Sequence, residues 1–230
     1  MVLNRKVEMT RSVRKVVVVG TNTDVGKTWV TCQLVEAAVA NGVAVAARKI
    51  VQSFDPLADS QLQDRVLLGQ ATGEDPLIVC PDTKSFGAAL APPMAAAMVG
   101  APIPNLAELL DLWPCDDGTA LLFIETAGGL RSPQAIDADA LDVTAWIDPE
   151  VVVIVAKDEL GVISQVRLCC DALADRLGAT PIVVILNQMP GTTPSLLNSA
   201  WLREEDGFDV RLAPKDLQGL ADVLTSGLSD

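Results

Sequence analysis

Short apolar runs rich in valine and isoleucine recur along the chain and alternate with longer segments in which apolar residues return at helical spacing. The runs cover residues 16–19, 43–47, 120–124, 151–156 and 181–186. A short run that is apolar throughout is typical of a strand buried on both faces of a sheet. Because helical segments separate most of the runs, the pattern predicts a single α/β domain with a mostly parallel central sheet and helices on both faces.

Two of the helical segments carry their own end signals. Residues 28–41 and 164–177 each end directly before a glycine, Gly42 and Gly178. Glycine readily adopts the left-handed conformation that closes a helix, so both segments are predicted as helices that end there.

The remaining parts of the chain are less regular. Residues 106–112 predict a further helix, and the segment 75–104, rich in proline and alanine, predicts loops and a short helix near the ligand site. Residues 1–14 are basic and lack the apolar core of a secretory signal, so we predict a disordered basic tail. Residues 15–230 then form the folded domain.

The clearest chemical signal is the run GTNTDVGKT, residues 20–28, between the first apolar run and the first helical segment. A strand, a glycine turn and a helix in this order form a nucleotide phosphate-binding loop, or P-loop. Backbone N–H groups around Gly26 attract phosphate oxygens, Lys27 adds a positive charge, and the Thr28 hydroxyl is suited to ligate Mg²⁺. Five residues separate Gly20 from Gly26, where the usual spacing is four.

Composition excludes several other classes of protein. A formal net charge of −13 argues against nonspecific binding to nucleic acid or to an anionic membrane, and no apolar run reaches membrane-spanning length. The chain has no histidine, which excludes Ser-His and Cys-His catalytic pairs and histidine metal ligands. Five cysteines without CxxC spacing predict neither a zinc site nor a disulfide framework, and a cytoplasmic location is expected.

Polar residues follow two of the apolar runs, where ligands of parallel sheets bind. Lys49 and Ser53 come after the run 43–47, and Glu125 closes the run 120–124 and precedes Thr126 and two glycines. We expect Glu125 to hold Mg²⁺ directly or through water. Each residue taken alone has an alternative interpretation: Lys49 as a solvated surface lysine, and Glu125 as a capping residue or salt-bridge partner.

Four motifs, in their order along the chain, resemble dethiobiotin synthetase. They are the loop 20–28, KIVQS at 49–53, ETAGGL at 125–130 and LGVIS at 160–164. The resemblance spans about residues 15–187. It implies an ATP- and Mg²⁺-dependent carboxylation and ring closure of 7,8-diaminononanoate with CO₂ to dethiobiotin, by way of a carbamate and a carbamic–phosphoric anhydride. It also implies a homodimer, with the segment around residues 161–165 facing the second subunit.

The resemblance, together with the P-loop chemistry, assigns roles to individual residues. Catalytic roles fall to Lys49, Lys27, Thr23 and Ser53. Nucleotide binding falls to Asp24, Val25, Gly26, Lys27, Thr28 and Asn187. Substrate binding falls to Ser53, Thr126, Gly128, Gly161 and Ser164. The expected Mg²⁺ ligands are Thr28, Asp64 and Glu125, with Asp59 as a competitor of Asp64.

Three departures from the family pattern leave the acceptor substrate open. Ser164 and Gln165 stand where family members carry Asn-His, Phe54 stands in place of a glycine, and Thr126 also replaces a glycine. Another P-loop ATP-dependent ligase with a different acceptor is therefore an alternative, although a glutaminase triad cannot be built without histidine.

A regulatory ATPase similar to MinD and ParA, or a nucleotide-binding scaffold without catalysis, is the alternative of a different class. MinD and ParA carry a lysine five residues before the loop lysine, where this chain has Asn22. After Asn187 the chain continues Gln188-Met189-Pro190 rather than with the Lys-x-Asp that reads guanine. ATP is therefore the preferred nucleotide.

Overall fold

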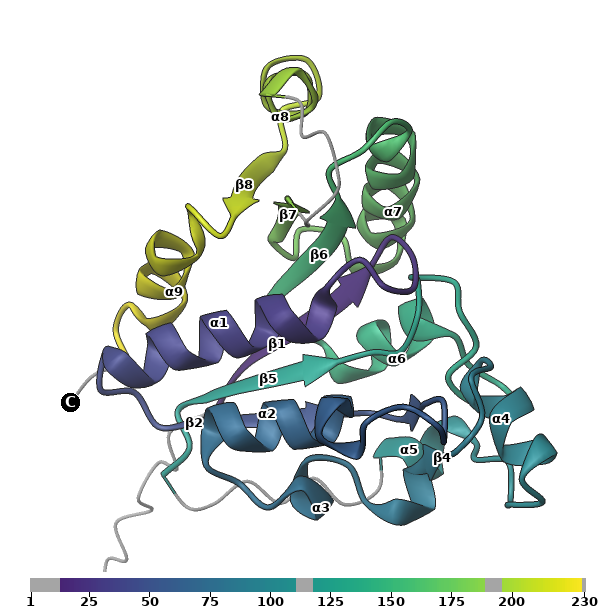
Figure 1. Ribbon diagram of the computed structural model, residues 1–230. Helices are drawn as coiled ribbons and strands as arrows, with labels where there is room; N and C mark the ends of the chain where they lie inside the picture. Colours follow the sequence, from purple (N-terminus) through teal and green to yellow (C-terminus); the bar gives the residue numbers. More distant parts are fainter. Residues whose placement is uncertain (1–12, 111–117, 189–195, 229–230) are drawn as a thin grey trace, which may run out of the picture.

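Six parallel strands form the centre of the molecule, in a computed structural model that describes residues 13–110, 118–188 and 196–228 (Figure 1). Across the sheet the strands are β2 (Val45–Lys49), β5 (Leu121–Glu125), β1 (Arg14–Gly20), β6 (Val151–Lys157), β7 (Ile182–Asn187) and β8 (Asp209–Ala213). All neighbouring strands of this sheet run parallel. The carboxyl ends of β1, β2 and β5 therefore lie side by side at one edge of the sheet.

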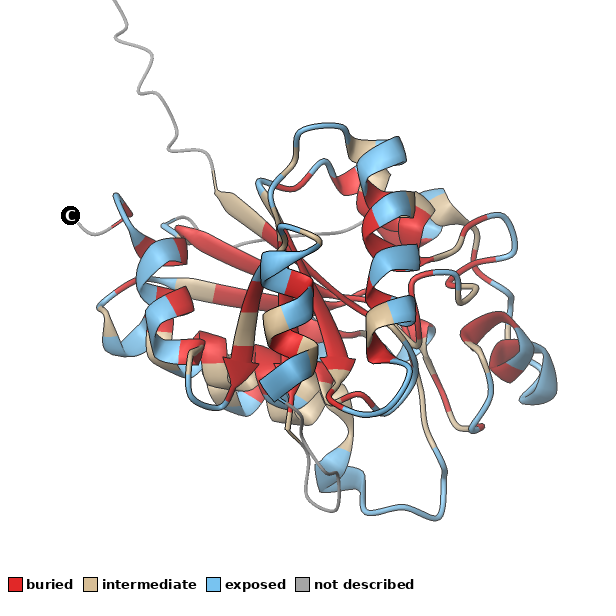
Figure 2. Ribbon diagram, turned by 90° about the horizontal axis from the view of Figure 1, so that it is seen from above, coloured by how far each residue is buried: buried red, intermediate tan, exposed pale blue. Residues whose placement is uncertain are grey.

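Helices cover both faces of the sheet, as Figures 1 and 2 show. One face carries α1 (Lys27–Ala40), α2 (Asp64–Thr72) and α9 (Leu217–Thr225), and the other carries α6 (Ala140–Ile147) and α7 (Val162–Leu177). Successive side chains of a strand point to opposite faces. Accordingly, Val16 and Val18 of β1 pack in the core beneath α1 and α9, while Val17 and Val19 pack in the core beneath α6 and α7.

The other elements are short. They are α3 (Pro76–Val79), α4 (Pro92–Met98), α5 (Leu106–Leu110), α8 (Leu196–Glu204), the 3₁₀ turns Ser60–Leu62 and Asp82–Lys84, and a two-stranded parallel sheet of β3 (Gln52–Ser53) and β4 (Ser85–Phe86). The segment 75–104 thus holds short helices and loops, as predicted.

The predicted α/β class and the parallel sheet are confirmed, with small shifts of boundaries. The second strand begins at Val45 rather than at residue 43, and Gly42 and Gly178 both have positive φ after the helices they follow. Arg14, which we assigned to the tail, begins β1, while residues 1–12 and the predicted helix end at 111–112 lie outside the described residues. Within the part of the chain that the structure describes, no helix is long and apolar enough to cross a bilayer.

Candidate functional site

The loop after β1 has the backbone conformation of a phosphate-binding turn. Gly26 has φ 88° and precedes the first residue of α1, and Asp24 also has positive φ, 56°. These left-handed residues turn successive N–H groups toward the mouth of the loop, next to the positive end of α1. A Cβ on Gly20 would lie 2.8 Å from the Asn22 carbonyl oxygen and 3.0 Å from the Lys27 Nζ, so glycine is needed where the loop begins.

The strand register brings Lys49 and Glu125 together beside this loop. Lys49, the last residue of β2, pairs with Glu125, the last residue of β5, and Glu125 pairs on its other side with Val18 of β1. Parallel strands of matched length place their terminal residues at the same edge of the sheet. The Lys49 and Glu125 side chains are almost completely buried, at 2% and 0% exposure.

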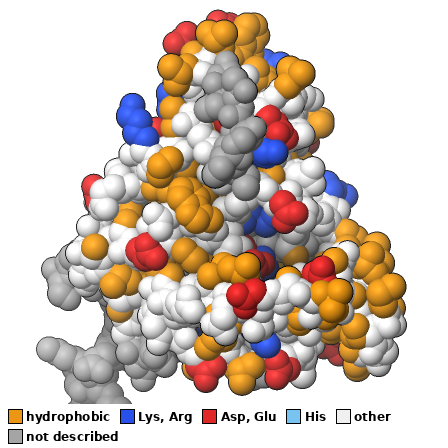
Figure 3. All heavy atoms as spheres, in the orientation of Figure 1, with side chains coloured by type: hydrophobic (Ala, Val, Ile, Leu, Met, Phe, Trp, Pro, Cys, Tyr) orange, Lys and Arg blue, Asp and Glu red, His pale blue; other side chains and the backbone are white. Residues whose placement is uncertain are grey.

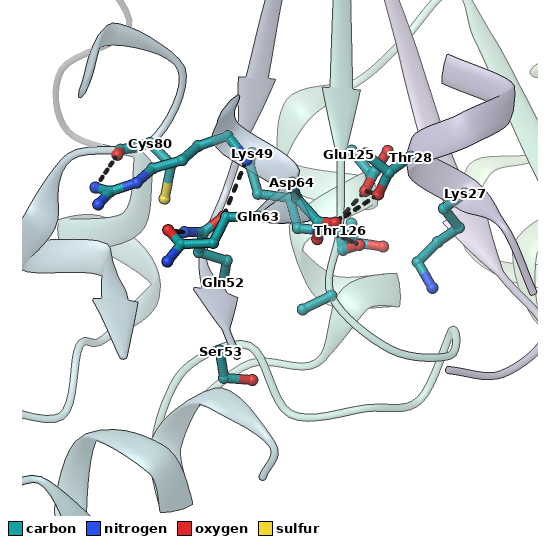
Figure 4. Close-up of polar contacts among 12 residues, drawn as sticks. Lys27, Thr28, Lys49, Gln52, Ser53, Gln63, Asp64, Cys80, Glu125 and Thr126 are labelled. Carbon is teal, nitrogen blue, oxygen red and sulfur yellow. Dashed lines mark hydrogen bonds and ion pairs between the residues drawn. The ribbon is translucent and has the colours of Figure 1, made fainter. Parts of the chain in front are cut away.

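Four side chains from four elements meet at this edge (Figure 4). The Thr28 Oγ1 lies 2.8 Å from Asp64 Oδ1 and 2.7 Å from Glu125 Oε1. The Lys49 Nζ lies 2.6 Å from Glu125 Oε1 and 2.7 Å from Asp64 Oδ2. We call Thr28, Lys49, Asp64 and Glu125 the strand-end cluster. It joins residues almost a hundred positions apart in the sequence.

The charges of this cluster shift the pKa values of its members. Burial and, after it, the nearby charge of Lys49 lower the pKa of Lys27 to about 8, against the opposing effect of Glu125, Asp64 and Asp24. Burial also disfavours the charged form of Lys49, but the charges and hydrogen bonds of Asp64 and Glu125 outweigh it and raise the pKa of Lys49 above its usual range. Burial tends to raise the pKa of Asp64, but the charge and hydrogen bond of Lys49 lower it below its usual value. Lys49 and Asp64 thus form an ionised pair at neutral pH.

The oxygen atoms of the cluster fit a magnesium ion. The Thr28 hydroxyl has one proton and faces two carboxylate oxygens, so it cannot donate to both at once. Cis ligands of octahedral Mg²⁺ at about 2.1 Å lie roughly 2.9–3.0 Å apart, close to the spacings of the Thr28 Oγ1 from Asp64 and Glu125. Two carboxylates and a hydroxyl leave positions for water and phosphate oxygens, which is the usual composition of a nucleotide-bound magnesium site.

A cavity of about 650 Å³ opens in front of the cluster. Its charged end contains Lys27, Thr28, Lys49 and Asp64, and Figure 3 shows basic and acidic side chains within the hollow of this face. The rest of the wall is mixed: it includes the apolar side chains of Trp29, Phe54, Leu62, Leu90 and Pro92 beside polar ones such as Gln52 and Gln63. The cavity can therefore hold a charged group at one end and an aliphatic chain along its wall.

Most of the residues singled out from the sequence lie around this cavity. Its lining includes Thr23, Asp24, Gly26, Lys27, Thr28, Lys49, Ser53, Asp64 and Gly128. Val25 lies beneath the loop, where its carbonyl accepts a hydrogen bond of 3.0 Å from the Asn187 amide. Asn187 thus ties the end of β7 to the loop. Asp59 is exposed and accepts a bond from the Gln61 N–H, so Asp64 is the aspartate that belongs to the cluster.

Three of the predicted substrate contacts lie away from the cavity. The Thr126 side chain is fully buried, and its hydroxyl lies 3.4 Å from the Val18 carbonyl oxygen, while its own carbonyl lies 3.3 Å from the Lys49 Nζ. It supports Lys49 rather than facing the cavity. Gly161 and Ser164 are exposed at the start of α7 and do not line the cavity.

The sequence did not reveal two residues beside the site. Thr31 is buried one turn after Thr28, and its Oγ1 lies 2.8 Å from the Glu125 Oε2. Ser132 lines the cavity and accepts a bond from the Gly129 N–H. The helical spacing of Thr28 and Thr31 was the available signal for the first, since residues three apart share one helix face.

Comparison with known proteins agrees with this geometry. A family model described as an AAA domain matches residues 14–213. The ATP-dependent dethiobiotin synthetase of Phenylobacterium zucineum is 32% identical over 221 residues, which cover 92% of this chain and 94% of that protein. The ATP-dependent dethiobiotin synthetase of Rhodopirellula baltica is 37% identical, and the match covers 75% of this chain and 72% of that protein. The synthetase of Mycolicibacterium vanbaalenii is 34% identical, and the match covers 86% of this chain and 83% of that protein.

Solved structures support the fold at much lower identity. A protein of the DUF1611 family from Anabaena variabilis has a TM-score of 0.52 at 16% identity, with coverage of 95% of this chain and 59% of that one. The cell division protein FtsY of Thermotoga maritima has a TM-score of 0.50 at 17% identity, with coverage of 96% and 70%. These two share the fold alone. The identity to the synthetases over most of the chain is far higher, and the chain belongs to the ATP-dependent dethiobiotin synthetase family.

Proposed function

We propose that this protein is an ATP-dependent dethiobiotin synthetase, a ligase that joins CO₂ to 7,8-diaminononanoate and closes the ureido ring with ATP and Mg²⁺. The observation that carries the proposal is the strand-end cluster beside the P-loop. Its lysine and its hydroxyl each lie within 2.8 Å of both carboxylates, at the charged end of the cavity. Membership of the synthetase family supports the same activity.

The shape and polarity of the cavity suit the proposed acceptor. A diamine with an aliphatic acid chain needs charged groups around its reacting amines and apolar wall along the chain. The charged end of the cavity and the wall of Phe54, Leu62 and Leu90 supply both. The backbone of Gly128 lines this space and has φ +66°. A Cβ there would lie 2.6 Å from the Ser132 hydroxyl, so glycine is needed at this position.

The reaction needs neutralisation of negative charge more than a strong base. One amine adds to CO₂ and loses a proton, which gives a carbamate. A carbamate oxygen then attacks the γ-phosphorus and releases ADP, and the second amine attacks the carbonyl carbon of the mixed anhydride and releases phosphate. Lys27 and Lys49 each place a positive charge where phosphoryl and carbamate oxygens would accumulate negative charge.

Thr28, Asp64 and Glu125 would hold the magnesium ion, which neutralises phosphate charge when bound. Thr23 and Asp24 stand in the loop beside the cavity, and Ser53 also lines it, with its hydroxyl bonded to the Leu90 carbonyl. Asn187 fixes the loop through Val25 and remains our candidate for contact with the adenine base. None of these roles requires histidine.

We also propose that the protein acts as a homodimer in the cytoplasm. Leu160, directly before Gly161, is fully exposed, and the Ser164 hydroxyl at the start of α7 is exposed as well. The N–H groups at this helix start are suited to a carboxylate, and in a dimer they would meet the acid end of a substrate bound by the other subunit.

An assay of phosphate release tests the proposed function. Purified protein with ATP, Mg²⁺, bicarbonate and 7,8-diaminononanoate should release phosphate and form dethiobiotin, and omission of the diamine should stop both. Phosphate release at an equal rate without the diamine would instead support a regulatory ATPase.

A further inference from the structure

A buried hydroxyl lies behind the metal-facing carboxylate of Glu125. Thr31 belongs to α1, has no exposed surface, and points at β5 from the helix above it. Its Oγ1 lies 2.8 Å from the Glu125 Oε2 and 2.9 Å from the Lys27 carbonyl oxygen. Thr31 does not line the cavity, so it cannot touch a nucleotide or an acceptor there.

The Thr31 hydroxyl has a single proton to share between these two acceptors. The Lys27 carbonyl lies in the first turn of α1, where the helix supplies it with a backbone N–H four residues on. The Glu125 carboxylate carries charge, and a bond to a charged acceptor is roughly twice as strong as one between neutral groups. Because Glu125 is completely buried, bulk solvent does not offer its oxygens an alternative donor. The proton therefore belongs on the bond to Glu125.

The two oxygens of Glu125 have different partners. The Oε1 meets Thr28 and Lys49, whereas the Oε2 has Thr31 as its partner among the described residues. Rotation about the last bond of a glutamate side chain is broad and nearly unrestricted by its own sterics. A fixed partner on Oε2 therefore acts together with the Lys49 ion pair on Oε1 to keep Oε1 toward Thr28.

We propose that Thr31 is a positioning residue, whose hydroxyl fixes the Glu125 carboxylate and thereby sets the affinity of the nucleotide complex for magnesium. In its consequence for catalysis the inference rests on the proposed function. Hydrogen-bond partners behind metal ligands typically change metal affinity by about 10–100-fold when they are removed.

The test compares Thr31→Val, which removes the hydroxyl at nearly constant shape, with Thr31→Ser, which keeps it. Mn²⁺ serves as the probe, and its dissociation constant is measured by electron paramagnetic resonance in the presence of a nonhydrolysable ATP analogue. Thr31→Val should weaken Mn²⁺ binding about 10–100-fold, and Thr31→Ser should stay near the wild-type value. Binding of the analogue in EDTA should remain the same in all three proteins.

A matched control is Thr144→Val. Thr144 is also a fully buried helical threonine, and its Oγ1 lies 2.6 Å from the carbonyl of Ala140, four residues earlier, far from the cluster in sequence. Thr144→Val should leave the Mn²⁺ affinity unchanged. This control distinguishes loss of the hydrogen bond to Glu125 from a general effect of removing a buried hydroxyl. Thr31→Ala replaces Thr31→Val if the valine variant fails to fold.

The proposal is overturned if the variant without the hydroxyl binds Mn²⁺ within about twofold of wild type. It is equally overturned if Thr31→Ser loses as much affinity as Thr31→Val. The binding experiment contains no diamine and no turnover, so its outcome is independent of the acceptor. Failure to form dethiobiotin with an intact Thr31 effect would refute the proposed function and leave this inference standing.

Discussion

The Lys49 ammonium lies 2.7 Å from the Asp64 carboxylate, beside the Thr28 hydroxyl that both of the cluster's carboxylates approach. A lysine in this position neutralises the charge of the Asp64 and Glu125 carboxylates. It is also next to the place where phosphoryl oxygens would lie in front of the P-loop. In the proposed mechanism the same side chain stabilises the two buried carboxylates and carries a positive charge toward the phosphoryl group.

Replacing Lys49 by glutamine should remove the reaction and retain nucleotide binding. Loss of one preorganised charge that stabilises a transition state typically lowers kcat by roughly 10²–10³-fold. Steady-state assays of dethiobiotin formation and calorimetry of ATP binding measure the two effects separately. Lys157→Gln is the control, because Lys157 is a partly exposed lysine of β6 that pairs with Glu159 at 2.9 Å. Turnover retained in Lys49→Gln would remove Lys49 from the site.

Binding of ATP should take up protons at mildly alkaline pH. Burial, with the charge of Lys49, lowers the pKa of Lys27 to about 8, and a bound triphosphate raises it again by favouring the ammonium form. At pH 8 Lys27 is about half protonated before ATP binds, so binding of ATP should take up about half a proton. Affinity is greatest below pH 8 and falls as pH rises through that value. Calorimetry in buffers of different ionisation enthalpy measures the uptake, and Lys27→Met should abolish it.

Gly128→Ala should destabilise the protein more than Gly42→Ala. Both glycines have positive φ, at +66° and +78°, but a Cβ on Gly128 would lie 2.6 Å from the Ser132 Oγ, whereas nothing lies within 4 Å of one on Gly42. The left-handed conformation alone disfavours alanine by about 1–2 kcal/mol. The clash at Gly128 should add roughly 1–3 kcal/mol. Urea denaturation compares the free energies of unfolding, and equal losses would show that the loop relaxes around the added methyl.

The fold followed from the apolar runs because five of the strands are buried on both faces. The sixth, β8, was missed because its sequence Asp-Val-Arg-Leu-Ala alternates charged and apolar residues, as suits a strand at the edge of the sheet. Asp209 is exposed and Arg211 half-buried, so β8 lacks the continuous apolar pattern on which the prediction relied, whereas β2, at the other edge, overlaps the apolar run 43–47. The two-residue strands β3 and β4 are too short to leave any pattern.

Site residues could be predicted from the sequence where a motif determines the backbone conformation. They were predicted less well where the role depends on the direction in which a side chain points. Asp64 was expected as the ligand with Asp59 as its competitor, and the start of α2 directs Asp64 toward Thr28. Thr126 was expected at the cavity, but its side chain is buried against Val18. In the sequence Thr31 cannot be distinguished from other buried helix residues, because its partner Glu125 lies on β5, far away along the chain.

The proposed dimer gives a further prediction at the start of α7. A charge on fully exposed Leu160, as in Leu160→Glu, should disrupt the interface, raise KM for the diamine and leave ATP binding unchanged. Light scattering gives the mass of the particle in solution. Val223→Glu, at a 60% exposed position on α9, is the control that should change neither the mass nor KM. A wild-type monomer with full activity would contradict the dimer.

The most direct measurement follows the carbon atom from bicarbonate into product. With ¹³C-labelled bicarbonate, 7,8-diaminononanoate, ATP and Mg²⁺, mass spectrometry should find one labelled carbon in dethiobiotin for each phosphate released. Phosphate release without labelled dethiobiotin, or at the same rate without the diamine, would contradict the assignment of this pocket to carboxylation and ring closure.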